Sequence, residues 1–508
     1  MKTLRLILGD QLNHQHSWYL DGSKECHYVM MEIRQETDYV RHHVQKVIGI
    51  FLAMRSFTRM LRDQGFQVHY FTIDDEYNQQ SLEKNIGYLI EKYQIEKFEY
   101  QLPDEYRLDQ SLIKICQSMN IPSQAFDTEH FLTTREELSI FFNGKKTFLM
   151  ENYYRHLRKK HNVLMKGGQP IQNQWNFDSS NRKSFPKSIS FPTRPTRKKS
   201  IRTLLKTIDS AGIETIGSVG DEMFWWPVTR KEALQDLTYF CDCLLSDFGK
   251  YQDAMHVDNP IGYHSLLSFA LNIKLLHPKE VIDRVIEKWK NDPDQIELSS
   301  VEGFIRQILG WREYMRGIYW SQMPKYSQTN FFNHFRKLPD WYWTGKTKMR
   351  CLSHAIRQSL DHGYAHHIQR LMITGNFGLL SGINPDEMDQ WYLGIYIDAF
   401  EWVEITNTRG MSQFADGGLV GTKPYVSSAN YIHNMSNYCE TCSYNYQLKT
   451  GKNACPFNSL YWHFHFRHRK KLEQNPRIGM VYRTWDKMNQ QSEILNQAEK
   501  YLADVNSL

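Results

Sequence analysis

The sequence predicts an α/β domain with a doubly wound parallel sheet, followed by a large all-α domain. Three observations indicate this architecture. The chain has 508 residues, which is too long for one ordinary core. Short apolar runs alternate with helical patterns over residues 1–135. From residue 215 to the end, apolar positions follow helical spacing and strand-like alternation is scarce.

The predicted strands of the first domain are short apolar runs that cover residues 4–8, 28–33, 68–73 and 98–102. A helix is predicted between the second and third runs, with a stop at Gly65, because six apolar residues follow helical spacing: Val47, Ile50, Phe51, Met54, Phe57 and Leu61. This β-α-β order predicts a parallel sheet. Its ligands are expected at the carboxyl ends of the strands, where residues 9–11 and 32–36 fall.

Between the two domains, residues 136–214 are predicted to connect them, and the helical domain is predicted to span residues 215–508. Residues 178–200 are basic and broken by prolines, which is typical of a linker or a long surface loop. The chain has no run of 18 apolar residues, and its first residues do not resemble a signal peptide. We therefore expect a cytoplasmic protein with no membrane association.

Composition limits the classes of function that are possible but does not identify one. The net charge of +6 permits nucleic-acid binding, which depends on how the basic residues cluster. Aromatic residues make up 14% of the chain, with 13 Trp. Such a content indicates a large aromatic core, a stacked cofactor, or stacked bases.

Four of the eight cysteines have the spacing of a metal centre. Cys439, Cys442 and Cys455 form a C-x2-C-x12-C pattern, and Cys351 is the remaining cysteine in the C-terminal half. Thiolates select zinc or an iron–sulfur cluster, and the spacing alone leaves both open. Disulfides are not expected in a cytosolic chain, so the other four are interpreted as ordinary thiols: Cys26, Cys116, Cys241 and Cys243.

Three segments of the helical domain together resemble the photolyase–cryptochrome family. They cover residues 264–269, 302–314 and 366–404. The four cysteines sharpen the likeness, because the iron–sulfur bacterial group of that family has one cysteine before its last flavin segment and three after it. The resemblance extends over nearly the whole chain, from Gly9 to Trp462.

The resemblance implies three cofactors: FAD, a [4Fe–4S] cluster on the four cysteines, and a 6,7-dimethyl-8-ribityllumazine antenna. Arg370 and Asp398 would flank the flavin ring, with Glu404 near flavin N5. A carboxylate can accept from the flavin N3–H, and a paired arginine keeps that carboxylate ionised. Asp10 and Glu36 would bind the lumazine. The other implied flavin residues are His264, Ser265, Leu266, Ser268, Glu302, Gln307 and Arg312.

The implied activity is light-driven repair of (6-4) pyrimidine photoproducts by an electron from excited reduced FAD. His366 and His367 match the histidine pair of the family, with His367 as the proton donor, because the pKa of histidine lies near working pH. Tyr425 and Tyr431 resemble residues near the lesion.

Two further groups are implied. Trp343, Trp391 and Tyr392 match the chain of oxidisable rings that reduces the flavin. Asp178, Asp253 and Glu404 are candidates for holding Mg²⁺ or another divalent cation, which needs several converging oxygens.

The implied partner is UV-damaged DNA, with the lesion flipped into the pocket of a monomeric protein. Candidate phosphate contacts are Arg182, Lys183, Lys187, Lys423 and residues 467–471. Three alternatives stay open: a cryptochrome-type photoreceptor with the same cofactors, a cyclobutane-dimer photolyase, and a non-photochemical iron–sulfur DNA-binding protein like those among primase subunits.

Overall fold

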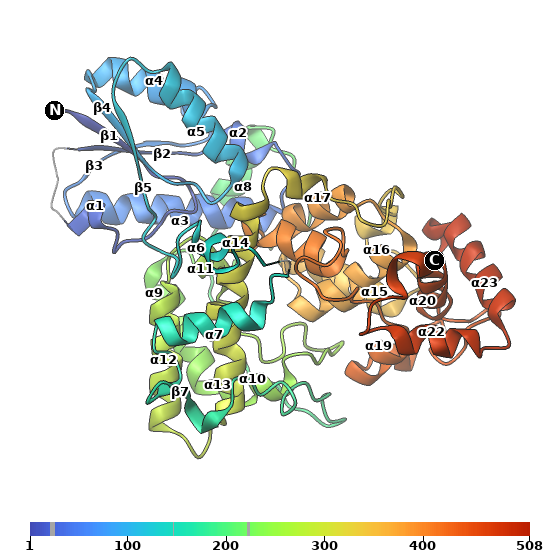
Figure 1. Cartoon of the computed structure of the whole chain (residues 1–508). Coiled ribbons are helices and arrows are strands. Elements are labelled where there is room, and N and C mark those ends of the chain that lie inside the picture. The colour runs from blue at the N-terminus through green and yellow to red at the C-terminus, as the bar shows by residue number, and fades with distance from the viewer. Residues whose placement is uncertain (21–25, 146, 221–223) are drawn as a thin grey trace.

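The computed structural model describes residues 1–20, 26–145, 147–220 and 224–508 and contains an α/β domain joined to a larger helical domain (Figure 1). Five parallel strands lie in the order β3-β2-β1-β4-β5. Their bounds are β1 (Thr3–Leu6), β2 (His27–Met31), β3 (Gln67–Phe71), β4 (Lys97–Gln101) and β5 (Ser123–Phe126). The predicted fold class is confirmed, and the first four strands fall on the four predicted runs.

Helices cover both faces of this sheet. Along β2, Val29 and Met31 pack with α4 (Leu82–Tyr93) and α5 (Tyr106–Ser118), whereas Tyr28 and Met30 pack on the side of α3 (Val44–Asp63). This alternation is expected because successive side chains of a strand point to opposite faces. The core on the α3 side is continuous with the core of the helical domain. The two domains therefore pack together over one face of the sheet.

The strand order reverses beside β1. The chain builds outward through β2 and β3 and then adds β4 and β5 on the other side of β1. Open α/β sheets bind ligands at such a reversal, beyond the carboxyl ends of the strands. Gly9 lies just after β1, and a Cβ there would stand 3.0 Å from both Ile50 Cγ2 and Met54 Sδ. Glycine thus lets the end of β1 approach α3 closely.

The segment between the sheet and the later helices contains helices of its own. They are α6 (Glu137–Phe141), α7 (Met150–Lys160) and α8 (Arg202–Ser210). The first two pack against helices of the helical domain, among them α14 (Glu313–Gln322). Residues 178–200 are almost entirely irregular.

Several short helical segments of the second domain carry the predicted site residues. They are α11 (Ser268–Asn272), α13 (Leu298–Ile305), η3 (Arg306–Arg312), α15 (Arg350–His362), η6 (Gln369–Gly375), α17 (Pro385–Ile395), α18 (Glu401–Ile405) and η7 (Thr406–Ser412). The wide π-type turns η6 and η7 touch at Gly375, where a Cβ would overlap Ser412 Oγ. Such turns are rare and occur often at functional sites.

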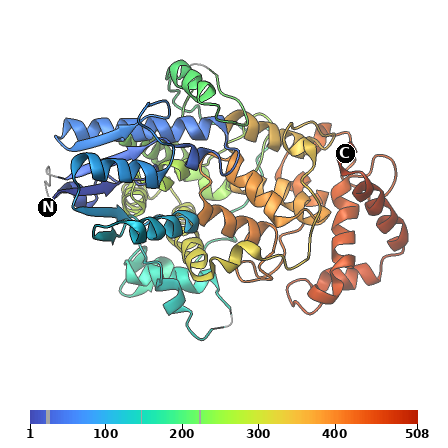
Figure 2. The same cartoon turned by 90° about the horizontal axis from the view of Figure 1, so that it is seen from above.

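The last helices stand at the end of the molecule farthest from the sheet, as the view from above shows (Figure 2). They include α20 (Pro456–Arg467), α22 (Gly479–Asp486) and α23 (Gln491–Ala503). Among the described residues, no helix combines the length and the apolar character that crossing a bilayer requires.

Candidate functional site

The predicted pair Arg370 and Asp398 is formed. Arg370 Nη2 lies 2.9 and 3.1 Å from the two Asp398 carboxylate oxygens, and Ser268 Oγ donates to the same carboxylate at 2.6 Å. The guanidinium also stacks 3.8 Å from the centre of the Tyr396 ring. The Arg370 side chain lies deep in the protein, yet 22% of its surface remains accessible to solvent. The guanidinium therefore stays partly accessible beside the Asp398 carboxylate.

Three histidines lie beside this pair. The rings of His264 and His366 stack with centroids 4.5 Å apart. Burial, followed by nearby arginine charge, lowers the pKa of His264 to about 3 and that of His367 to about 4. Burial also holds the pKa of His366 well below its usual value. His264 Nε2 and His366 Nδ1 have no hydrogen-bond partner among the described residues, which indicates a place for a polar ligand.

Four of the predicted lesion-side and cation residues gather around Arg182. Its guanidinium lies 3.4 Å from Asp178 Oδ2 and 3.5 Å from Asp253 Oδ2. Burial raises the pKa of Tyr425 and Tyr431, and the charge of Arg182 acts on both phenols. The two tyrosines and two aspartates thus share one neighbourhood around Arg182.

Glu404 lies with a different set of charges. Its carboxylate accepts from Thr408 Oγ1, and burial followed by the charge of Asp389 raises its pKa well above the usual range. The structure therefore brings Asp178 and Asp253 together but does not bring Glu404 to them. Within the described ranges, no three His, Cys, Asp or Glu side chains converge so as to hold one metal ion.

The side chains of the second predicted segment bond to one another and to residues outside the Arg370–Asp398 pair. Glu302 is bound by Arg306 at 3.1 and 2.6 Å and by the Tyr154 hydroxyl at 2.9 Å. Gln307 donates to Gly303 O at 2.9 Å, and Arg312 Nη2 lies 3.0 Å from His130 Nε2. Among the described residues, none of the three predicted side chains is hydrogen-bonded to Arg370 or Asp398.

Ser265 and Leu266 lead into α11, which supplies Ser268. Ser265 Oγ accepts from Leu267 N at 3.4 Å. Leu266 is buried and has a φ of 59°, in the left-handed region that non-glycine residues seldom adopt. Strained backbone of this kind is concentrated at functional sites, so this turn fits a binding role.

The predicted electron-transfer residues belong to a longer row of rings. Trp391 contacts Tyr392 with centroids 5.2 Å apart, and Tyr392 lies 5.6 Å from Tyr396, the ring beneath Arg370. On the other side, Trp391 contacts Tyr342 at 5.2 Å. Trp343 follows Tyr342 in the chain and is 41% exposed. The row of contacting rings therefore runs from Tyr342 through Trp391 and Tyr392 to Tyr396 beside the Arg370–Asp398 pair, and Trp343 is linked to it as the chain neighbour of Tyr342. Tyr342 is a member that the sequence did not reveal.

The four predicted cysteines line one cavity. Cys351 comes from the first turn of α15, Cys439 and Cys442 from the turn η8 (Tyr438–Thr441) and its cap, and Cys455 from the cap of α20. Apolar and aromatic side chains complete the wall: Met349, Ala429, Ile432, Tyr438, Tyr444, Tyr446 and Phe457. We call this the cysteine cage. Such a dry, sulfur-lined enclosure suits a soft metal centre.

Asp10 and Glu36 lie beyond the carboxyl ends of β1 and β2, near the reversal of strand order. Arg107 holds Glu36 with two bonds of 3.1 and 2.7 Å. Burial, together with the nearby charges of Glu105 and Asp10, raises the pKa of Glu36 to about 7. Arg107 acts in the opposite direction. The two predicted carboxylates are therefore neighbours.

A line of buried charges crosses from this edge of the sheet to the helical domain. Lys274, which has no exposed side-chain surface, lies 2.7 Å from Asp104 Oδ2 and donates to Asp10 O at 2.6 Å. Arg316 Nε approaches Asp104 Oδ1 at 4.0 Å. We call these four residues the interdomain seam: Asp10 and Asp104 of the sheet domain with Lys274 and Arg316 of the helical domain.

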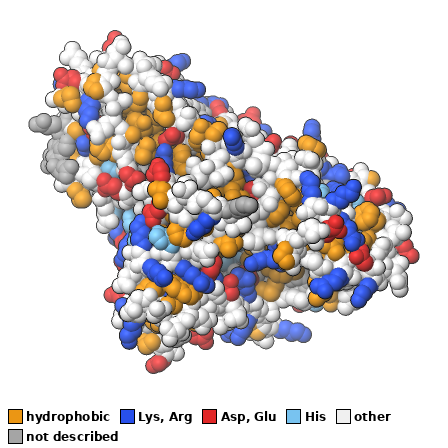
Figure 3. All heavy atoms as spheres, viewed as in Figure 1, with side chains coloured by type: hydrophobic (Ala, Val, Ile, Leu, Met, Phe, Trp, Pro, Cys, Tyr) orange, Lys and Arg blue, Asp and Glu red, His pale blue; other side chains and the backbone are white. Residues whose placement is uncertain are grey.

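Some of the basic residues proposed for DNA contact already pair with carboxylates of the protein. Arg469 pairs with Glu473 at 2.9 Å and with Asp486 at 2.6 Å, and Arg182 lies between two carboxylates. Lys183, Lys187 and Lys470 are exposed. Figure 3 shows Lys and Arg side chains gathered over the C-terminal helices.

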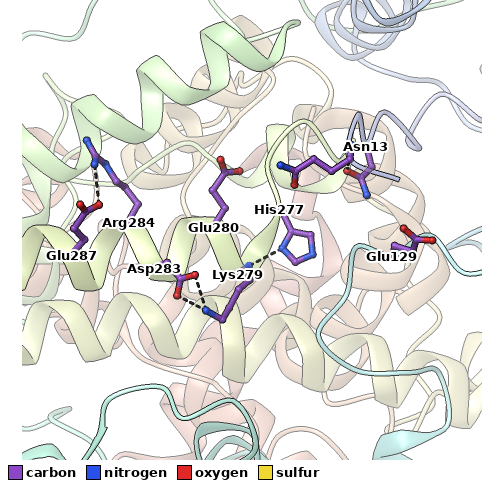
Figure 4. Close-up of a pocket in the computed structure, with 9 residues that line it drawn as sticks. Asn13, Glu129, His277, Lys279, Glu280, Asp283, Arg284 and Glu287 are labelled. Atoms are coloured by element: carbon purple, nitrogen blue, oxygen red, sulfur yellow. Dashed lines mark hydrogen bonds and ion pairs between the residues drawn. The ribbon is translucent and has the colours of Figure 1, made fainter. Parts of the chain in front are cut away.

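A polar hollow lies away from these residues, between α12 (Pro278–Asn291) and the loops that carry Asn13 and Glu129 (Figure 4). Its volume is about 740 Å³. Its charges pair with one another, Lys279 with Asp283 and Arg284 with Glu287. None of the predicted site residues lines it.

Sequence reasoning missed three buried residues beside the histidines: Gln358, Gln369 and Tyr438. Gln369 stands within the His366–Arg370 motif, and Tyr438 directly precedes Cys439. Their position next to motif residues was the available signal for these two. Gln358 had none, because one glutamine in a helix carries no pattern.

An α/β domain packed on a helical domain that holds an Arg–Asp pair beside a row of aromatic rings is the arrangement that the resemblance to the two-domain photolyase–cryptochrome flavoproteins implies. Residues 5–225 match the profile of the deoxyribodipyrimidine photo-lyase-related protein family. The chain is 43% identical to a (6-4) photolyase of Agrobacterium fabrum over 494 residues, which cover 96% of each chain. The uncharacterized protein R855 of Acanthamoeba polyphaga mimivirus is 33% identical over 131 residues, 26% of this chain and 98% of that protein.

Two solved structures share the fold. A bacterial class III photolyase from Agrobacterium tumefaciens superimposes with a TM-score of 0.54 at 15% identity, over 83% of this chain and 81% of that one. A cryptochrome from Synechocystis sp. PCC6803 gives 0.53 at 13% identity, over 81% and 83%. The chain belongs to the photolyase–cryptochrome family, as its sequence predicted.

Proposed function

We propose that this protein is a light-driven DNA photolyase that repairs (6-4) pyrimidine photoproducts. The observation that carries the proposal is the meeting of a histidine trio, His264, His366 and His367, with the Arg370–Asp398 pair. The near full-length similarity to a protein named as a (6-4) photolyase supports the choice of lesion.

Membership of the family implies FAD, and the residues present fit it. The Asp398 carboxylate, which accepts hydrogen bonds from Arg370 and Ser268, offers a further acceptor for the flavin N3–H. The unpartnered nitrogens of His264 and His366 are free to bind polar atoms of the cofactor or the lesion. When bound and reduced, the flavin supplies a light-excited electron donor.

His367 is the residue that we assign to proton transfer. Its imidazole is neutral in the protein without DNA, because burial and Arg370 lower its pKa to about 4. DNA phosphates entering the pocket would act in the opposite direction, since a nearby anion favours the protonated ring. Lesion binding would therefore favour the protonated His367 ring, which is the form that can donate. The proton would then leave from His367 toward the lesion.

The neighbourhood of Arg182 is assigned to the lesion. Tyr425 and Tyr431 offer half-buried rings and hydroxyls to a flipped base. Asp178 and Asp253 would take a divalent cation only if Arg182 moves away, because the guanidinium lies between their carboxylates. Mg²⁺ and Arg182 would thus compete for one place.

The remaining cofactors are assigned by fit. Four thiols on the wall of one small, largely enclosed cavity favour a [4Fe–4S] cluster, and their soft ligand chemistry agrees with it. Asp10 and Glu36, at the point where such sheets bind ligands, would hold 6,7-dimethyl-8-ribityllumazine.

The test is blue-light repair of an oligonucleotide with one (6-4) photoproduct, after anaerobic reduction, by the wild type and by His367→Ala. Wild type should restore the two pyrimidines, and the variant should lose about 100-fold or more of the repair rate, as removal of a general acid does. Binding without repair by the wild type would sink the proposal and favour a cryptochrome-type photoreceptor. Repair of a cyclobutane dimer in its place would overturn the lesion assignment.

A further inference from the structure

The loop that carries the catalytic histidines is held by two buried glutamines. Gln358 Nε2 donates to Tyr364 O at 3.2 Å, and Gln369 Oε1 accepts from the His366 backbone N–H at 3.1 Å. The two amides also bond to each other in both directions, at 2.7 and 3.0 Å. A buried amide is costly to leave without partners, so each bond restricts the loop.

Tyr438 joins this glutamine pair to the cysteine cage. Its hydroxyl accepts from Gln369 Nε2 at 3.1 Å, and its side chain is fully buried. Its ring forms part of the wall of the cage, and the next residue is Cys439. One hydrogen bond therefore separates the cage wall from the clamp on the histidine loop.

Helix α15 makes a second connection to the same clamp. It carries Cys351 in its first turn and Gln358 seven positions later. Seven residues are two helical turns, so both side chains lie on one face about 10 Å apart. The helix ends at Gly363, whose φ of 62° turns the chain into the loop that contains Tyr364 and His366.

We propose that Tyr438, Gln358 and Gln369 are positioning residues that couple the cysteine cage to the histidine loop. The two connections start at different cysteines and converge on one amide pair. That pair fixes the backbone of His366, whose ring stacks on His264. The consequence for repair rests on the proposed function, whereas the coupling is a property of the resting protein.

The first experiment measures the coupling without any repair reaction. Holoprotein labelled with ¹³C at the histidine rings is titrated by NMR as wild type, Tyr438→Phe and Tyr501→Phe, with His367→Ala used for assignment. Tyr501 is a matched control, because its hydroxyl also bonds beside a cage cysteine, to Ala454 O at 2.7 Å. The His366 and His367 resonances should shift, with altered titration, in Tyr438→Phe and stay at wild-type positions in Tyr501→Phe.

The second experiment separates positioning from binding. In Tyr438→Phe, the affinity for lesion DNA should remain within about twofold of wild type, while repair per absorbed photon falls about five- to tenfold, as expected for one lost hydrogen bond at a reacting group. Gln369→Leu removes its bonds to His366, Gln358 and Tyr438 and should give a larger fall. Iron and flavin content are measured alongside.

Wild-type histidine spectra in both Tyr438→Phe and Gln369→Leu would overturn the proposal. It would also be overturned if Tyr501→Phe produced the same shifts, or if the changes simply followed loss of iron or flavin. Should the wild type repair no lesion, the proposed function fails, but the spectra still decide the coupling.

Discussion

Individual histidines in the helical domain are buried in their neutral form. His465 is 2% exposed, and neither of its ring nitrogens has a partner among the described residues. It packs among Tyr461, Phe464 and Tyr482, and burial lowers its pKa to about 4. His367 has a similar pKa, but its side chain is exposed, so a ligand can reach it and change that pKa. The same imidazole is thus a packing group in one place and a proton donor in the other.

Replacing His465 by Phe should reduce the sensitivity of the fold to acid. A histidine whose pKa falls from 6.5 to about 4 on folding contributes stability that is complete above pH 6.5 and is lost as the pH falls toward 4. The variant should therefore exceed the wild type by about 2 kcal/mol in the free energy of unfolding at pH 4.5, relative to the difference at pH 8. Urea unfolding at both pH values measures this. An unchanged pH dependence would show that the ring is already hydrated.

The family resemblance predicted the Arg370–Asp398 contact, and the spacing of the cysteines predicted their gathering in one cavity. Neither of them predicted the direction in which the Glu404 carboxylate points. Its place in the chain is close to Asp398, yet its carboxylate turns toward Thr408. Linear spacing does not reveal which way a buried side chain points, and the convergence of oxygens on a cation depends on that direction.

At the scale of elements, π-type turns determine how closely the segments of the pocket approach. The turns η6 and η7 carry Arg370 and Thr408, and they meet at Gly375. The Tyr392 hydroxyl also donates to Arg370 O at 2.7 Å in this region. The absence of a side chain at Gly375 therefore sets the separation of two elements and, through it, the position of Arg370.

Gly375→Ala should force η6 and η7 apart. The added methyl group would overlap Ser412 Oγ and Arg370 O, and overpacking of this kind costs about 1–3 kcal/mol. Flavin content should fall as well, because Arg370 moves. Gly87→Ala is the control: no atom lies within 4 Å of its added Cβ in α4, so it should stabilise by about 0.5–1 kcal/mol. Thermal unfolding and flavin absorbance of both purified variants measure these effects. Equal stability of the two would contradict the packing argument.

Elements were predictable where hydrophobic patterning was strong. The runs that formed β1 to β4 are buried and apolar, and α3 ends beside Gly65 as its spacing indicated. β5 escaped prediction because it is a mostly exposed edge strand, Ser123–Phe126, with little apolar signal. The short π-type turns have no sequence signature of their own, since they arise from packing between helices.

At the scale of the whole molecule, the interdomain seam holds the two domains together. Its Lys274 is completely buried and bridges Asp10 and Asp104. Both carboxylates follow strands of the sheet, whereas Lys274 follows α11 of the helical domain. A buried charge pair of this kind adds little net stability but is costly to break.

Lys274→Met should leave Asp10 and Asp104 without their cation. The free energy of unfolding should fall by about 3 kcal/mol, as for other broken buried pairs. The lumazine content should also fall relative to flavin, because Asp10 loses its partner. Lys279→Met removes an exposed partner of Asp283 and should change stability by less than about 0.5 kcal/mol. Urea unfolding and the absorbance ratio of the two chromophores are the measurements; equal effects of the two variants would argue against the seam.

The interdomain seam also affects how excitation energy would pass between two bound chromophores. Transfer of excitation between two chromophores depends on the angle between their transition dipoles as well as on their separation. Buried ion pairs between Lys274 and two sheet-domain aspartates leave little freedom for the domains to rotate. An antenna bound beside Asp10 would then keep one orientation toward a flavin beside Asp398, so every molecule in solution would collect light with the same efficiency.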